Sequence, residues 1–291
     1  MPTRTRLLLC ALALALATRC SDAPSPSHAA AGAGPAVAHI ELTWRDAEGQ
    51  RGATPLGSGF VVSGQGHVVT AQHVVKNGRK RLASLESAEA VRLIATLPGA
   101  GADEDPIEVE LSTVAQYPDS DLALMELVAD PFSSRGDPRA REVLDGENAR
   151  GVARLSLEPP EHGTAVVLSG YPNGRKQLNR IPGRLVDATF LSEVGVRNEP
   201  APGWIDRMLA RGIYLGDMDT EPGYSGGPVF LVDTGGVVGV CSSIMLLNVS
   251  AAGAAPLRFP LRYRSKITVL IPAAAVAGIL HAHGVPWREA E

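Results

Sequence analysis

Short segments rich in Val, Leu and Ile recur along most of this chain, and turns that contain Gly or Pro separate them. The segments have the length of β-strands, and several of them alternate apolar and polar residues as half-buried strands do. Helical patterns are few, and the clearest covers residues 273–281. This pattern predicts an all-β fold of the barrel type with a short C-terminal helix. The predicted strands cover residues 37–44, 57–62, 67–70, 91–97, 107–114, 121–127, 164–170, 183–190, 213–215, 229–232, 237–244 and 266–271.

The composition fits a globular protein of this architecture. The chain has 291 residues, of which 45% are hydrophobic and 20% charged, so it can form one large domain or two small ones. The formal net charge is -4, whereas a nucleic-acid-binding protein usually carries a strongly basic face, so we expect no nucleic-acid partner. Cys10 and Cys20 lie in the N-terminal region and Cys241 lies in an apolar run, which predicts no disulfide framework.

Residues 1–20 have the features of an export signal. Arg4 and Arg6 give a positive start, and residues 7–17 form an apolar run that is too short to cross a bilayer comfortably. These features predict a secretory signal peptide, so we expect the protein to be exported.

The segment after this signal leaves two outcomes open. Cys20 stands where bacterial lipoproteins carry their lipid-modified cysteine, but Arg19 replaces the small residue that such signals need. The chain either carries a lipid on Cys20, which would be its contact with a membrane, or is cleaved further on, within residues 29–38. Residues 21–36 are rich in Ser, Pro, Ala and Gly without apolar periodicity, which predicts a flexible tether.

One serine, Ser225, lies among glycines in residues 223–228. Glycine allows turn conformations that residues with a Cβ resist, so this turn can direct backbone N–H groups to a point beside the serine hydroxyl. A nucleophile beside such donors is the arrangement that acyl transfer requires, because the donors face the negative charge that develops. The segment therefore predicts a nucleophilic serine, provided that a base and an orienting acid lie elsewhere in the chain.

His73 and an aspartate supply these groups upstream. His73 follows a Val-rich strand in a short turn-like segment, where a scaffold can present a catalytic group. Asp121 opens an apolar strand, and a buried carboxylate there could orient an imidazole. Asp119 competes for this role, but it follows Pro118 and has the character of a turn residue. Four other histidines lack such a setting: His67, His162, His281 and His283. His281 and His283 could mimic metal ligands, but no third ligand clusters near them, so we expect no metal site.

The order His73, Asp121, Ser225 is the order of the triad in chymotrypsin-type serine proteases, and other triad folds use other orders. Residues 70–74, 121–124 and 223–228 resemble the histidine, aspartate and serine motifs of that clan. Within the clan, the chain is most similar to bacterial trypsin-like proteases of the HtrA (high-temperature requirement) type. The supporting segments, within a resemblance that covers about residues 37–283, are residues 57–60, 170–174, 238–240 and 267–272.

The resemblance implies two six-stranded antiparallel β-barrels with the active site in the cleft between them. The first barrel would cover about residues 37–128 and the second about 160–272, with residues 284–291 as a tail. HtrA proteases usually continue into PDZ domains, but the residues after Ser225 are too few for the last strand, the helix and a PDZ domain, so we expect none. The implied location is outside a bacterial cytoplasm: the periplasm, the outer membrane as a lipoprotein, or the medium. The oligomeric state stays open.

The resemblance also implies a role for each residue of the site. Ser225 would attack a peptide carbonyl, His73 would accept and return its proton, and Asp121 would hold the imidazole. The N–H groups of Gly223 and Ser225 would form the oxyanion hole. No cofactor is implied, and the partners would be protein or peptide substrates. Tyr224 stands where digestive proteases carry an aspartate, so we expect no activation by a new N-terminal amine.

The expected substrate preference depends on residues around the nucleophile. Asp219 stands where trypsin-like enzymes place the acid that binds a basic P1 side chain. Ser242, Ser243 and Ile244 match the wall of the specificity pocket, and Ile244 stands where deep pockets carry Gly. We therefore expect a shallow pocket for small aliphatic P1 residues, with a basic preference as the alternative. Asp217 matches an acid that is common in HtrA sequences and is expected to be structural.

Two other functions stay open at this point. A protease fold without activity could bind peptides as an added strand along residues 242–244. A processing protease of narrow specificity could need a partner before its site is ordered. The complete triad favours a peptidase over the binding module.

Overall fold

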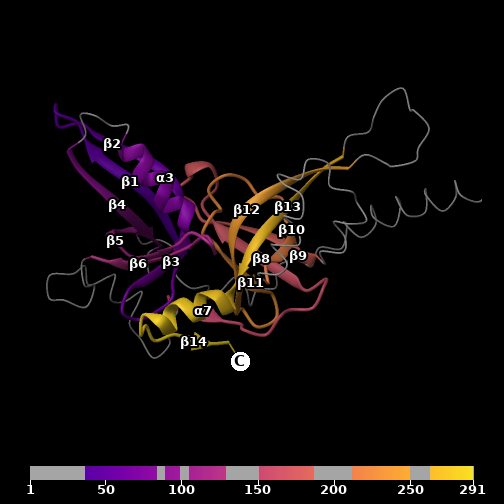
Figure 1. Ribbon diagram of the computed structural model, residues 1–291. Coiled ribbons are helices and arrows are strands. Elements are labelled where there is room, and N and C mark those ends of the chain that lie inside the picture. Colours follow the sequence, from indigo (N-terminus) through magenta and orange to yellow (C-terminus); the bar gives the residue numbers. More distant parts are fainter. Residues whose placement is uncertain are drawn as a thin grey trace, which may run out of the picture.

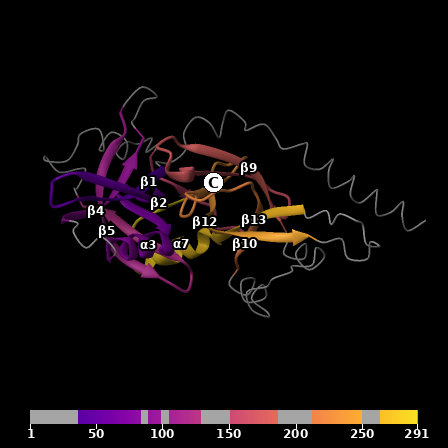
Figure 2. The same cartoon turned by 90° about the horizontal axis from the view of Figure 1, so that it is seen from above.

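Antiparallel strand pairing organises both halves of the chain in the computed structural model, which describes residues 37–83, 89–98, 105–128, 151–186, 212–249 and 263–290. Two closed barrels lie side by side, and a helix near the C-terminus packs against both of them (Figure 1 and Figure 2). The predicted all-β fold with two antiparallel barrels is confirmed. The leader at residues 1–20 and the tether at 21–36 lie outside the described residues.

The first barrel contains six strands in the order β1-β2-β3-β6-β5-β4, and it closes because β1 pairs with both β2 and β4. Alternation along β1 directs Ala38 and Ile40 into the barrel, where they pack against Val61, Val68 and Met125. The strands are β1 (Val37–Arg45), β2 (Arg51–Val61), β3 (His67–Ala71), β4 (Glu89–Leu97), β5 (Ile107–Tyr117) and β6 (Leu122–Leu127).

The outer face of β1 is buried as well. His39 and Glu41 are only 1% and 4% exposed, because the segment after β8 covers them. The ring of Tyr171 lies 5.2 Å from the ring of His39, and Lys176 Nζ lies 3.9 Å from Glu41 Oε1. The Tyr171 hydroxyl donates a hydrogen bond of 3.0 Å to the carbonyl of Val37. This strand therefore forms part of the contact between the two barrels.

The second barrel contains the strands from β8 to β13, in the order β11-β8-β9-β10-β13-β12, and the pairing of β11 with β12 closes it. The short strand β7 pairs in parallel with both β12 and β14, and β14 lies within the segment that was expected to be a tail. The strands are β7 (Arg154–Leu155), β8 (Ala165–Gly170), β9 (Asn179–Val186), β10 (Tyr214–Asp217), β11 (Pro228–Leu231), β12 (Val237–Val249), β13 (Tyr263–Pro272) and β14 (Arg288–Glu289).

Helix α3 (Gln72–Ala83) begins directly after β3, where the sequence suggested only a turn-like segment. Its buried positions, Val74, Val75 and Gly78, lie on one face of the helix, as the period of 3.6 residues requires. This face packs against the first barrel and fixes the first turn of the helix, which carries His73.

Helix α7 (Ala273–Ala282) joins the two barrels, and its prediction from the sequence is confirmed. Val276 and Leu280 are fully buried in an apolar cluster that also contains Phe60 and Leu124 of the first barrel and Val240 of the second. Because buried apolar surface stabilises a fold by about 25 cal/mol per Å², this shared cluster opposes separation of the barrels. In the part of the chain that the structure describes, no helix is long and apolar enough to cross a membrane.

Candidate active site

His73 and Asp121 are in direct contact. His73 Nδ1 lies 2.9 Å from Asp121 Oδ2 and 3.1 Å from Oδ1, and the backbone N–H of His73 donates to Oδ1 at 3.0 Å. An ionised carboxylate can only accept hydrogen bonds, so Nδ1 carries the proton of the neutral ring and Nε2 is left as the base. The two side chains are 34% and 26% exposed, so both remain within reach of solvent and substrate.

The turn between β5 and β6 presents Asp121 to the histidine. Asp121 has a φ of 52°, in the left-handed region, which Asp tolerates better than most residues with a Cβ. Its carbonyl accepts the N–H of Gln72 at 2.9 Å, which ties the turn to the start of α3. Asp119 in the same turn is exposed. Of the two candidate acids, Asp121 is therefore the one that contacts the imidazole.

Burial and hydrogen bonding act in opposite directions on the pKa of Asp121. Burial raises this pKa, while hydrogen bonds from His73 and Ser242 and the charge of His73 lower it. The Ser242 hydroxyl is a close donor, 2.5 Å from Oδ2. The net effect lowers the pKa of Asp121 below its ordinary value of 3.8, so the carboxylate is ionised at neutral pH and can stabilise an imidazolium.

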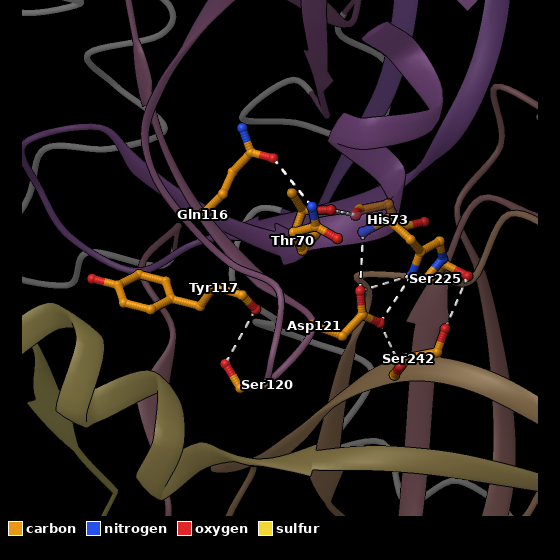
Figure 3. A network of polar contacts seen from close by, with 10 residues as sticks. Thr70, His73, Gln116, Tyr117, Ser120, Asp121, Ser225 and Ser242 are labelled. Atoms are coloured by element: carbon orange, nitrogen blue, oxygen red, sulfur yellow. Dashed lines mark hydrogen bonds and ion pairs between the residues drawn. The ribbon is translucent and has the colours of Figure 1, made fainter. Parts of the chain in front are cut away.

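Ser225 comes from the second barrel, on the loop between β10 and β11. The ring of His73 lies between the carboxylate of Asp121 and the side chain of Ser225 (Figure 3). The Ser225 hydroxyl donates a hydrogen bond of 3.3 Å to the carbonyl of Ser242. Figure 3 thus places Ser225 on the side of the imidazole away from Asp121, while its hydroxyl proton is directed at the Ser242 carbonyl and must turn to the imidazole for transfer.

Every carbonyl of residues 222–225 accepts a hydrogen bond from a donor outside this segment. Such loops have few intrinsic restraints when glycine is present, so these hydrogen bonds define the conformation. The pairs are Asn173 N–H to the Pro222 carbonyl (2.7 Å), Ser58 Oγ to the Gly223 carbonyl (2.7 Å), Gly227 N–H to the Tyr224 carbonyl (2.8 Å) and Ser58 N–H to the Ser225 carbonyl (2.8 Å).

These hydrogen bonds also set the direction of the neighbouring N–H groups. In a trans peptide the N–H points away from the preceding carbonyl, and the described residues contain no cis peptide. The bonds to the Pro222 and Tyr224 carbonyls therefore orient the N–H groups of Gly223 and Ser225. Within the described ranges neither of these N–H groups donates to a backbone carbonyl.

Two positions of this loop require glycine. Gly223 has a φ of 106°, and a Cβ there would collide with the carbonyl of Tyr171. Gly226 has a φ of 84°, and a Cβ there would collide with the carbonyl of Ser58 and the hydroxyl of Thr70. The backbone angles, the close approach of the segment after β8 at Gly223 and that of the first barrel at Gly226 thus explain the glycine-rich sequence.

Tyr224, next to the nucleophile, points into the core of the second barrel. Its side chain is 1% exposed and belongs to an apolar cluster with Val229 and Cys241. Burial raises the pKa of Tyr224 to about 12, so its hydroxyl is neutral at physiological pH. This side chain anchors the loop by packing and carries no charge that could pair with an amine.

The two aspartates in the segment before the nucleophile are exposed. Asp219, the predicted partner of a basic substrate, is exposed. The next residue, Thr220, is 1% exposed, and its hydroxyl lies 3.0 Å from that of Thr268 on β13. Asp217 is also exposed at the end of β10, and partial burial raises its pKa. A neutral pair of hydroxyls, rather than a carboxylate, therefore lies buried behind this segment.

The predicted pocket wall on β12 is described in part. Ser242 is buried and contacts both Asp121 and Ser225, whereas Ser243 is exposed. The backbone of Ile244 lies in β12, but its side chain lies outside the described residues. The size of the pocket thus stays a prediction from the sequence.

Two histidines away from the site, His67 and His283, contact hydroxyl groups. His67 Nδ1 lies 2.8 Å from Ser63 Oγ, and His283 Nε2 lies 2.6 Å from the Tyr117 hydroxyl. Among the residues that the structure describes, His, Cys, Asp and Glu side chains form no group of three or more that could hold a metal ion.

Sequence reasoning gave no role to Ser58, Tyr171 or Asn173, although all three contact the nucleophile loop or support it. Their contacts use backbone groups, two hydroxyls and the Asn173 amide, which donates to Glu221 Oε2 at 2.7 Å, and no spacing pattern in the sequence marks them. The glycines beside these residues were the signal that the sequence offered, because they mark places where two segments approach closely. A Cβ on Gly57 would meet the Ser225 carbonyl at 2.8 Å, and a Cβ on Gly170 would meet Ser58 Oγ at 2.8 Å.

Comparison with known families gives a match over most of the chain's described core. The sequence model of the trypsin-like peptidase domain matches residues 57–240, a range that contains His73, Asp121 and Ser225.

A relative and two solved structures extend this comparison. The "Probable periplasmic serine endoprotease DegP-like" of Ectopseudomonas mendocina (strain ymp) is 29% identical over 195 residues, which make up 67% of this chain and 31% of the relative. The structure of the HtrA-type protease AlgW with a decapeptide has a TM-score of 0.53 at 19% identity, over 90% of this chain and 69% of that one. The active form of the Rv3671c protease from M. tuberculosis has a TM-score of 0.48 at 20% identity, over 89% and 85%.

Proposed function

Because this chain belongs to the trypsin-like peptidase family, we propose that it is a serine endopeptidase that cleaves protein or peptide substrates. The observation that carries the proposal is the contact of His73 with Asp121, with Ser225 on the other side of the imidazole. The similarity to a DegP-like endoprotease and the fold shared with an HtrA-type protease support the same reaction.

The proposed reaction begins when Ser225 Oγ attacks the carbonyl carbon of the scissile bond and its proton passes to His73 Nε2. Asp121 stabilises the imidazolium that forms. The carbonyl oxygen becomes negative and accepts hydrogen bonds from the N–H groups of Gly223 and Ser225, each worth about 10²–10³ in rate. The C–N bond breaks as His73 donates the proton to the leaving amine. A water molecule then attacks the acyl-enzyme and passes its proton to His73, and the bond to Ser225 Oγ breaks as His73 returns the proton to Ser225.

For the substrate, we propose small aliphatic side chains at P1. The exposure of Asp219 and the buried Thr220–Thr268 pair support a pocket without a charge at its base. A basic P1 side chain would need a buried or focused negative charge to offset its lost hydration. Ile244 in the pocket wall would further limit the depth.

For the location, we propose export followed by lipidation of Cys20 or by cleavage within residues 29–38. The basic and apolar character of residues 1–17 and the periplasmic name of the DegP-like relative support export. Mass spectrometry of the mature N-terminus, with Cys20→Ser as the comparison, distinguishes the two routes: a lipid mass that disappears in the variant supports the anchor.

A serine-reactive fluorophosphonate probe tests the proposed activity. The native protein should be labelled at Ser225, and Ser225→Ala should not be labelled. Ser156→Ala, a half-buried serine of the second barrel, should be labelled like the native protein. Absence of labelling in the native protein, or labelling that persists in Ser225→Ala, would contradict the proposal; peptide binding without labelling would favour the non-catalytic module.

Cleavage-site profiling on a denatured proteome tests the substrate preference. Small aliphatic P1 residues should dominate both for the native protein and for Asp219→Asn. A profile rich in Lys and Arg that Asp219→Asn abolishes would overturn this preference and assign Asp219 to the pocket.

A further inference from the structure

Ser58 of β2 lies fully buried at the point where the first barrel touches the nucleophile loop. It is 0% exposed, and both its backbone N–H and its side-chain hydroxyl donate hydrogen bonds to the nucleophile loop of the second barrel. Its N–H donates to the carbonyl of Ser225 at 2.8 Å, and its Oγ donates to the carbonyl of Gly223 at 2.7 Å. One residue of the first barrel thus holds two carbonyls of the loop in the second.

The same hydroxyl also binds the turn on the other side of the loop. Ser58 Oγ accepts the N–H of Tyr171 at 2.9 Å, and this turn supplies Asn173 N–H to the carbonyl of Pro222. The hydroxyl therefore uses both its proton and a lone pair, and it links the turn at residues 171–173 to the loop. The carbonyl of Ser58 is occupied as well, by the Thr70 hydroxyl at 2.6 Å.

The loop needs such external restraints. Gly223, with a φ of 106° and no Cβ, has little preference of its own for this conformation over others. Its carbonyl lies in the peptide that joins it to Tyr224, between the two peptides that carry the Gly223 and Ser225 N–H groups. The orientation of this middle peptide sets backbone angles of Gly223 and Tyr224, and therefore how the two N–H groups lie relative to each other. The Ser58 hydroxyl is the side-chain donor that holds this carbonyl.

We infer that Ser58 is a positioning residue: its hydroxyl locks residues 222–225 in the conformation that aims the Gly223 and Ser225 N–H groups at the substrate oxygen. The inference rests on the proposed peptidase function for its kinetic consequence. Its structural consequence, a loop that loosens when one hydroxyl of the other barrel is removed, does not depend on that function.

Ser58→Ala removes this restraint and leaves the buried N–H of Tyr171 and the half-buried carbonyl of Gly223 without their shared partner. The second-order rate constant of fluorophosphonate labelling should fall by about 10-fold to 100-fold, because small displacements of catalytic groups have effects of this size. With a peptide substrate, kcat should fall while KM changes little. Ser58→Cys, with a weaker donor of similar shape, should recover part of the rate.

Ser63→Ala is the matched control. Ser63 is also buried and also loses side-chain hydrogen bonds, to His67, but it lies at the far end of the β2–β3 hairpin. The thermal stability of the Ser63→Ala variant should fall as in Ser58→Ala, while the labelling rate of Ser63→Ala should equal that of the native protein. A purely structural role for Ser58 predicts equal rates in both variants.

Hydrogen–deuterium exchange of the peptide that spans residues 222–227 gives the second readout. Exchange there should be faster in Ser58→Ala than in Ser63→Ala and intermediate in Ser58→Cys. Equal exchange in the two alanine variants would overturn the inference, whether or not the native protein is labelled. Lack of labelling in the native protein would reject the peptidase, and the exchange result would still decide the role of Ser58.

Discussion

The carboxylate of Asp121 accepts hydrogen bonds from the ring and backbone of His73 and from the Ser242 hydroxyl. A side chain with so many partners in one geometry fixes both the position and the tautomer of the histidine. The left-handed backbone of Asp121 brings the carboxylate to this point, so the residue combines an uncommon conformation with a shifted pKa.

Asp121→Asn should therefore reduce kcat by about 10⁴-fold without unfolding the protein, because the amide would favour the wrong tautomer of the imidazole. Steady-state kinetics on a cleaved peptide measure this effect. Asp119→Asn, an exposed change in the same turn, should keep the native rate. A larger loss in Asp119→Asn than in Asp121→Asn would assign the orienting acid to Asp119.

Helix α7 packs in apolar surroundings and contacts both barrels. Leu280 is 0% exposed and packs in the cluster shared by the barrels, while His281 beside it is exposed. The helix therefore contributes to the placement of the two halves of the site, although it carries none of the proposed catalytic groups.

Leu280→Ala should lower the free energy of unfolding by about 2–5 kcal/mol, since it leaves a cavity in this cluster. His281→Ala should stay within about 0.5 kcal/mol of the native protein, because it changes only an exposed position. Urea unfolding followed by circular dichroism measures both values. Similar small values for both variants would mean that α7 is only loosely attached.

The sequence predicted the elements whose apolar residues alternate or repeat over a buried face, such as β3, β6, β8 and α7. It did not predict α3, because the buried face of that helix is limited to Val74, Val75 and Gly78 among basic residues. His73, Asp121 and Ser225 were found through their chemistry and their order in the chain. Ser58 and Asn173 were not, because their contacts with the loop use a hydroxyl, a side-chain amide and backbone N–H groups, which few sequence patterns reveal.

For the whole molecule, the contact between the barrels contains a buried histidine. Burial lowers the pKa of His39, and the positive charge of Lys176 lowers it further. Glu41 faces it at 3.9 Å, and Glu108 lies 3.8 Å from the same Lys176. The folded protein thus binds this proton less readily than the unfolded chain does, so stability must fall as the pH drops below the ordinary value of 6.5.

His39→Leu should reduce the loss of unfolding free energy between pH 7.5 and pH 5, roughly the range in which an unperturbed histidine titrates. Urea unfolding at several pH values measures the slope. His281→Leu, at an exposed position, should keep the native slope. An unchanged slope in His39→Leu would place the acid sensitivity elsewhere in the molecule.

The hydrogen bonds between Ser58 and the nucleophile loop join two segments that are far apart in the chain, so they form only after both segments have been synthesised. Synthesis proceeds from the N-terminus, so His73 and Asp121 emerge first, Ser225 follows, and β13 and α7 emerge after it. An emerging chain therefore holds every proposed catalytic side chain before the second barrel can close and dock against Ser58. We expect such a nascent chain to be inactive until the second barrel is complete, because the nucleophile loop lacks its hydrogen bonds from Ser58 before then.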